Sequence, residues 1–224
     1  METNLKLAAE LFARTLPQKP VDDDPDAAPI KIPWRRYVEI EDAVLKMYRR
    51  ADARTMPLDV FEIALSLDCS PIPYRALGPQ LYPALSEYSE DGFSAWRLGD
   101  KWAIYYNDRK PFARQRFTIA HELGHVMLGH REHSALAEQE ANHFAVAALC
   151  PLPLLALYDI RLVPEIARIF KISEDCAENR LEDLIRWEAL EEWKRNRDFG
   201  NEVRQRFQLL EPYQTLMFQE KSSS

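Results

Sequence analysis

The stretch that decides the fold is residues 117–125, Phe-Thr-Ile-Ala-His-Glu-Leu-Gly-His, which contains a His-Glu-x-x-His pentad. On an α-helix, His121 and His125 lie four residues apart on one face, where they can share a metal ion. Glu122 follows His121 directly in the sequence. Its side chain can reach the solvent side of the metal, where a bound water would lie. The pattern predicts that His121 and His125 are metal ligands and that Glu122 activates the water.

Chance is the alternative explanation of the pentad, because composition alone produces it in about one chain per hundred of this length. The flanking residues argue against chance. Thr118 and the apolar pair Ile119-Ala120 precede the pentad, and apolar residues follow it at 126–128, as in a helix packed in a protein core. We expect this helix to end at Gly129 and a second helix to begin near Ser134 or Ala135.

A catalytic zinc site needs a third protein ligand. A later histidine at the metzincin spacing is excluded, because position 131 is an arginine. Glu138 and Glu140 remain. In a helix, Glu138 and Asn142 share a face, so Glu138 can bind the metal while Asn142 holds a ligand histidine through its second ring nitrogen. We therefore prefer Glu138, with Glu140 as the alternative.

Residues 93–107 have the pattern of a β-hairpin. Strand-forming residues fill 93–97 and 102–106, and residues 98–101 supply the turn. Such a sheet can offer a free edge to an extended substrate, and it can pack behind the helix. We expect it to do both. Tyr105 and Tyr106 could stabilise an oxyanion, although tyrosines in strands more often pack.

Several polar residues near the pentad allow two interpretations. Arg114 and Arg116 either line a cleft or extend into solvent from the first helical turn, and we favour solvent. His130, His133 and His143 are expected at the surface or as supports of the metal ligands.

The chain of 224 residues is 46% apolar, enough for one core with an appendage. Its net charge of −7 argues against non-specific nucleic-acid binding and is compatible with a basic protein partner. Neither a membrane-spanning stretch nor a signal peptide is expected. Three scattered cysteines, one of which (Cys150) could be suspected as a ligand, indicate free thiols in a reducing compartment. These features predict a cytoplasmic protein without a membrane partner.

The remaining sequence predicts helices. Residues 163–181 superficially resemble a helix-turn-helix, but acidic residues between Glu174 and Asp183 would repel phosphate. Residues 185–210 are expected to form one longer charged helix. We divide the chain into three regions: 1–33, an N-terminal helix with a linker rich in proline and aspartate; 34–155, the core; and 156–224, a helical extension.

The chain resembles the ImmA/IrrE family of zinc metallopeptidases. The resemblance rests on four segments between about residues 57 and 185: the strand Ala103–Asn107, residues 114–125, the Glu138-x-x-x-Asn142-x-Phe144-Ala145 run, and Leu149-Cys150-Pro151. It implies an α+β, zincin-like fold with a small antiparallel sheet beside the active-site helix and helices added at both ends. It also implies that His121, His125 and Glu138 bind zinc and that Glu122 is catalytic.

The same resemblance suggests a function. Family members are bacterial cytoplasmic proteins, often on mobile elements, and several cleave a DNA-binding repressor. We therefore expect a zinc-dependent endopeptidase acting on a protein or peptide, with a repressor as the favoured substrate. Two alternatives stay open: a DNA-binding regulator with a structural metal, and a zinc-binding sensor that binds a protein without cutting it.

Overall fold

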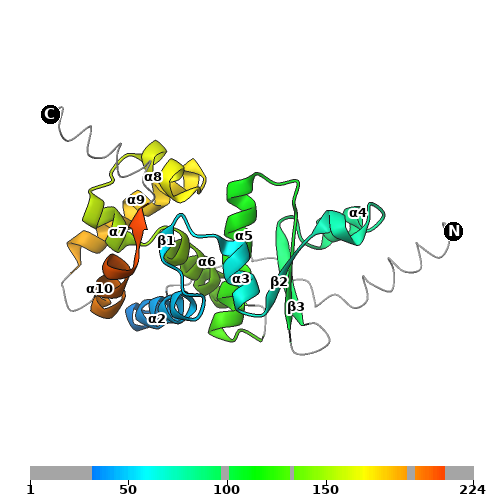
Figure 1. Cartoon of the computed structure of the whole chain (residues 1–224), viewed down its shortest axis with the longest axis horizontal. Helices are drawn as coiled ribbons and strands as arrows, with labels where there is room; N and C mark the ends of the chain where they lie inside the picture. Colours follow the sequence, from blue (N-terminus) through cyan, green and yellow to red (C-terminus); the bar gives the residue numbers. More distant parts are fainter. Residues whose placement is uncertain (1–31, 97–100, 132–133, 191–194, 210–224) are drawn as a thin grey trace. The chain divides into compact units, whose positions relative to one another are not determined.

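The structure is a computed structural model. It describes residues 32–96, 101–131, 134–190 and 195–209 (Figure 1). The predicted N-terminal helix and nearly all of its linker, residues 98–100 of the predicted hairpin turn and His133 lie outside these residues.

The chain divides into two compact units, each assembled from separate stretches. Among the described residues, unit 1 contains Ile32 and Val60–Asn142, and unit 2 contains Pro33–Asp59 and the chain from His143 onward. The three-part division predicted from the sequence describes regions of the chain rather than contact units, and it stays a prediction.

Unit 1 combines helices with a three-stranded sheet, which confirms the predicted α+β class. Its strands are β2 (Cys69–Pro73), β3 (Gly92–Trp96) and β4 (Trp102–Tyr106), in the order β2-β4-β3. Its helices are α3 (Val60–Ser66), the 3₁₀-helix η1 (Tyr74–Leu77), α4 (Tyr82–Tyr88) and α5 (Phe112–Leu128), and α6 (Ala135–Leu149) begins in it.

The sheet is mixed rather than wholly antiparallel. The predicted hairpin is present, since β3 and β4 pair antiparallel with Phe93 opposite Tyr105. However, β2 pairs with β4 in parallel, Ile72 beside Tyr105. A parallel neighbour needs a crossover connection, which here includes η1 and α4. Because Pro71 and Pro73 lack an N–H, β2 suits the edge position that it occupies.

Helix α5 packs against β3, β4 and α3 (Figure 1). Gly92 permits the close approach of β3, because a Cβ there would lie 2.5 Å from Thr118 Cγ2 and 2.5 Å from the Tyr105 carbonyl oxygen. Only glycine fits between the strand and the helix at this point. The helix ends where we predict, at Gly129, whose φ of 70° is left-handed.

Unit 2 is mostly helical. Its helices are α2 (Trp34–Arg50), α7 (Leu152–Tyr158), α8 (Val163–Phe170), α9 (Glu174–Ala189) and α10 (Arg197–Arg206), together with the last residues of α6. A short parallel pair, β1 (Thr55–Met56) and β5 (Gln208–Leu209), completes it.

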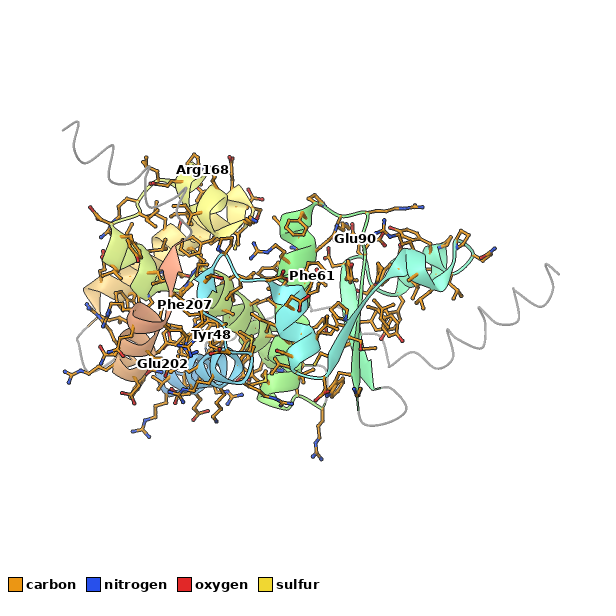
Figure 2. The ribbon with its side chains drawn as sticks, viewed as in Figure 1. Tyr48, Phe61, Glu90, Arg168, Glu202 and Phe207 are labelled. Atoms are coloured by element: carbon orange, nitrogen blue, oxygen red, sulfur yellow. The ribbon has the colours of Figure 1, made fainter. Side chains whose placement is uncertain are left out.

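Buried polar contacts fix the core of unit 2. The Tyr48 hydroxyl donates to the carbonyl oxygen of Ala148 at 2.7 Å, and its ring packs edge-on against Phe207 at 4.7 Å (Figure 2). Arg180 Nη2 donates to the Cys150 carbonyl oxygen at 2.9 Å, just beyond the end of α6. Burial raises the pKa of the Cys150 thiol to about 12, so this cysteine is a core residue and not a ligand.

The single helix predicted for residues 185–210 is wrong. Helix α9 ends at Ala189, and the next residue, Leu190, has an extended backbone. A new helix starts after Asn196, whose side chain accepts a hydrogen bond from the backbone N–H of Phe199 at 3.0 Å. Asparagine is among the strongest helix N-caps, so it favours a fresh start here over continuation.

One segment of the described chain, Ala135–Tyr158, is long and apolar enough to cross a membrane by length and composition. The expectation that no stretch reaches this level is therefore wrong. Within the structure, 67% of the apolar window is buried, as in a helix packed in a protein core.

Candidate metal centre

The two histidines of the pentad lie together in unit 1. His121 and His125 occupy successive turns of α5, and their Nε2 atoms are 3.0 Å apart. If both nitrogens were unprotonated, their lone pairs would repel each other at this distance. A proton or a metal ion must therefore be shared between them.

Glu138 supplies the third group of the cluster. It lies in the first turn of α6, and the hydroxyl of Ser134 caps this helix by accepting from the Ala137 N–H at 3.1 Å. Glu138 Oε2 is 3.2 Å from His121 Nε2, and Oε1 is 3.4 Å from His125 Nε2. The structure thus brings Glu138 to both histidines, as predicted.

The dimensions of this cluster fit a metal ion. Tetrahedral zinc with bonds of about 2.0–2.1 Å separates its ligand atoms by roughly 3.3 Å. The two Nε2 atoms here are 3.0 Å apart, and they lie 3.2 and 3.4 Å from the two different oxygens of Glu138. Among the described residues, His121, His125 and Glu138 form the one group able to hold a metal ion in this way.

Electrostatics at the cluster favour a cation. Burial alone would raise the pKa of Glu138, but its bonds to His121 and His125 hold that pKa well below its ordinary value. Burial would lower the pKa of His121, whereas the hydrogen bond and charge of Glu138 and the charge of Glu122 raise it above its ordinary value. A divalent ion bound here would take the place of the proton that these groups attract.

Asn142 supports His121. Its Oδ1 is 2.9 Å from His121 Nδ1, which confirms the predicted contact one turn beyond Glu138. When Nδ1–H donates to this oxygen, the lone pair of His121 is on Nε2, the atom that faces the cluster.

His125 has a longer support through His130, which is one of the two places expected for that residue; the part that Glu140 plays in it was not predicted. Its Nδ1 is 3.0 Å from Nδ1 of His130, and His130 Nε2 is 2.9 Å from Glu140 Oε2. When His125 Nδ1–H donates to His130 and His130 Nε2–H donates to Glu140, the lone pair of His125 is on Nε2. Glu140, only 5% exposed, thus ends this chain of contacts and is not part of the cluster of His121, His125 and Glu138.

Glu122 is buried in unit 1, with 7% of its surface exposed, rather than facing solvent. Its negative charge contributes to the raised pKa of His121 and to that of Tyr88, where burial is the larger cause. A carboxylate is therefore close enough to act electrostatically on the metal cluster, as catalysis by Glu122 requires.

The remaining candidates have contacts of their own. Tyr105 stacks on Phe93 at 5.0 Å and Tyr106 packs edge-on against Phe61 at 5.6 Å, which supports the packing interpretation. Arg114 pairs with Asp91 at 2.6 Å.

Two polar residues are more buried than we expected. Arg116 is 2% exposed, so its predicted place in solvent is wrong. His143 belongs to unit 2, where its Nε2 is buried. Helical periodicity alone did not distinguish these inward positions from outward ones.

A protein-family model matches the part of the chain that contains this centre. Residues 77–182 match the Peptidase_M78 family model, described as an IrrE N-terminal-like domain. The match includes α5, α6 and all four predicted site residues. A search of curated proteins found no significant match.

Proposed function

Because the chain belongs to the IrrE N-terminal-like family of metallopeptidase type through residues 77–182, we propose that it is a zinc-dependent endopeptidase. The proposed substrate is a cytoplasmic protein, with a DNA-binding repressor as the favoured one, and the proposed location is the cytoplasm. The observation that carries the proposal is the cluster of His121, His125 and Glu138, whose nitrogen and oxygen atoms lie 3.0–3.4 Å apart, close to the spacing of ligands around zinc.

These three residues would hold the ion, and two nitrogens with one carboxylate are ligands typical of catalytic zinc. When bound, zinc supplies a Lewis acid and lowers the pKa of a water ligand. Glu122 would accept a proton from the attacking water and pass it to the leaving nitrogen of the peptide. Asn142 and the His130–Glu140 pair would orient the two histidines.

The sheet offers a place for an extended substrate. Among the described strands, β3 pairs only with β4, so its other edge could take main-chain hydrogen bonds beyond Gly92, whose N–H and C=O are bonded to the Ser89 hydroxyl. Helix α5, which carries the pentad, packs against β3. The net charge of −7 suits a basic partner, as many DNA-binding proteins are.

The test uses Glu122→Gln, which keeps the size of the side chain and removes the base. The purified protein, loaded with one equivalent of zinc, is incubated with the DNA-binding repressor encoded nearest to it. Cleavage is followed by mass spectrometry. We expect Glu122→Gln to keep its zinc and to cut about 10²–10⁴-fold more slowly.

Glu90→Gln is the matched control, since it makes the same change in unit 1 at an exposed residue that pairs with Lys110 (Figure 2). It should cut at the wild-type rate. If wild type and Glu122→Gln both relieve repression while the repressor stays intact, the protein acts by binding, and the endopeptidase proposal is wrong.

A further inference from the structure

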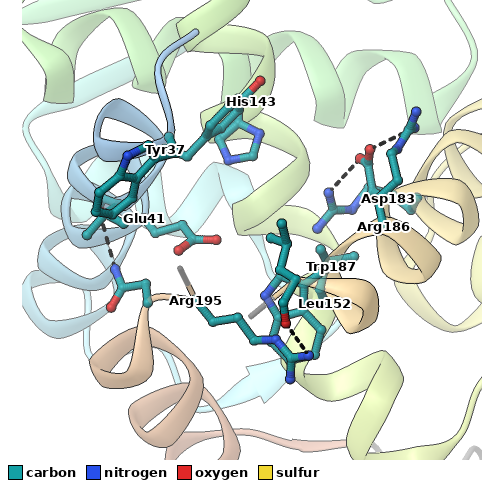
Figure 3. A pocket seen from close by; sticks show the side chains of 13 residues that line it. Tyr37, Glu41, His143, Leu152, Asp183, Arg186, Trp187 and Arg195 are labelled. Carbon is teal, nitrogen blue, oxygen red and sulfur yellow. Dashed lines mark hydrogen bonds and ion pairs between the residues drawn. The ribbon is translucent and has the colours of Figure 1, made fainter. Parts of the chain in front are cut away.

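Unit 2 contains a cavity that the metal centre does not use. This pocket, which we name the α2–α9 pocket, has a volume of about 300 Å³ (Figure 3). Helix α2 contributes Trp34, Tyr37 and Glu41 to its lining, α6 contributes His143, and the end of α9 with the following residues contributes Trp187 and Arg195. A cavity of this size accommodates a molecule of one or two fused rings.

Two polar atoms in the lining lack a hydrogen-bond partner within the described chain. They are His143 Nε2 and Arg195 Nε, and both are buried. Burial lowers the pKa of His143 to about 3, so its ring is neutral and can donate from Nε2. Buried polar groups nearly always have a partner, and a ligand in the pocket could supply one to each of these two donors.

Arg195 is already held in place. Its Nη2 donates to the carbonyl oxygens of Glu188 and Leu190 at 2.6 and 2.9 Å. Its guanidinium lies over the Trp187 ring, 4.7 Å from the centroid. Little conformational entropy would therefore be lost when a ligand binds this side chain. The Nε–H can still donate a hydrogen bond to an anionic oxygen.

Aromatic side chains form the walls of the pocket. The Tyr37 ring contacts the His143 ring edge-on at 4.5 Å, so the unpartnered histidine lies against an aromatic wall. Trp34 and Tyr37 are 46% and 38% exposed, high values for such large apolar side chains. A flat ring system entering the pocket would cover them.

The charges of the lining favour an anion. Arg180, Arg186 and Arg195 line the pocket, against the two acids Glu41 and Asp183. Burial raises the pKa of Glu41 to about 8, so this carboxyl is mostly neutral at neutral pH. The lining is therefore positive overall, and an aromatic anion suits it better than a neutral or cationic ring.

From these contacts we propose that the α2–α9 pocket binds a small flat aromatic carboxylate. Its carboxylate accepts from Arg195 Nε–H, its ring packs among Tyr37 and Trp187, and a hydroxyl on the ring meets His143 Nε2. The site is separate from the metal centre and does not depend on peptidase activity.

The test uses three matched probes: 6-hydroxy-2-naphthoate, 2-naphthoate without the hydroxyl, and the neutral 6-hydroxy-2-naphthamide. Each is titrated with the full-length, zinc-loaded protein and followed by fluorescence anisotropy. The hydroxynaphthoate should bind saturably, and the amide about tenfold or more weakly, because it lacks the charge-assisted bond. The naphthoate should bind about fivefold more weakly, because it leaves His143 unpaired.

Two variants test which residue causes each preference. Arg195→Gln should remove the preference for carboxylate over amide, and His143→Phe should remove the preference for the hydroxyl. Arg204→Gln is the matched control: it removes the same charge from an exposed residue of α10 outside the pocket, and it should bind all three probes as wild type does.

The proposal is overturned if no probe binds saturably, or if Arg195→Gln and His143→Phe behave like Arg204→Gln. If either variant loses the circular dichroism spectrum of wild type, the test is made on wild type alone. NMR spectra of the protein with ¹⁵N-labelled histidine are then recorded with each ligand. The hydroxynaphthoate should then shift the His143 Nε2 resonance and the naphthoate should not. An unchanged resonance with both ligands contradicts the proposal.

Discussion

The metal centre of unit 1 and the α2–α9 pocket of unit 2 both place histidines among buried groups, but they treat the ring nitrogens differently. In the metal centre, the second nitrogen of His121 faces Asn142 and that of His125 faces His130. In the pocket, Nε2 of His143 has no partner among the described residues. In the first arrangement the supported histidines direct their Nε2 atoms at a place where a metal ion could bind. In the second, the neutral ring of His143 has an Nε2–H that can donate to a ligand.

The largest expected effect comes from removing a ligand of the prepared centre. His125→Ala deletes one of three proposed ligands and breaks the chain to His130, so the variant should retain almost no zinc where wild type holds about one ion per chain. Plasma emission spectroscopy of the dialysed proteins measures this. His143→Phe is the comparator and should keep its zinc. Full zinc retention by His125→Ala would mean that the pentad is not the metal site.

A second experiment separates the two acids of α6. Glu138→Gln removes a proposed ligand and should weaken zinc binding by far more than Glu140→Gln. The latter removes only the anchor of His130 and should cost about 10–100-fold in affinity. Competition with a chelator of known affinity gives both values. A larger loss in Glu140→Gln would place the third ligand there and contradict the geometry.

The grouping of the three proposed ligands could be predicted because it depends on local spacing. His121 and His125 lie one helical turn apart, and so do Glu138 and Asn142, and α-helical geometry turns both intervals into shared faces. The two acids could be separated for the same reason, since Glu140 lies two residues beyond Glu138 and faces elsewhere.

What the sequence did not reveal depends on contacts between distant segments. The His130–Glu140 pair forms only once the connection between α5 and α6 has a definite path, and no periodicity encodes that path. The parallel pairing of β2 with β4 joins residues more than thirty positions apart. Burial of Arg116 and His143 likewise depends on what packs over each helix face, which helical spacing leaves open.

The smallest expected effect tests the unpaired histidine through the pH dependence of stability. The folded protein keeps His143 neutral down to a pKa of about 3, whereas the unfolded chain takes up a proton near its ordinary value of 6.5. The unfolded state therefore binds more protons between these values, and stability falls as the pH drops through this window. By pH 5 this loss is about 2 kcal/mol. His143→Phe should lack it.

Urea unfolding of wild type and His143→Phe at pH 7.5 and pH 5 measures the difference, in which the contributions of all other groups cancel. Glu41→Gln provides the control of opposite sign. The pKa of Glu41 is raised from 4.5 to about 8 in the folded protein, so its contribution is fully present below 4.5 and is lost as the pH rises. Relative to wild type, the free energy of unfolding of Glu41→Gln should therefore increase toward pH 7.5, and that of His143→Phe should increase toward pH 5. Equal pH profiles for wild type and His143→Phe would show that His143 is protonated or solvated in the folded protein, and the contrast between the two sites would then disappear.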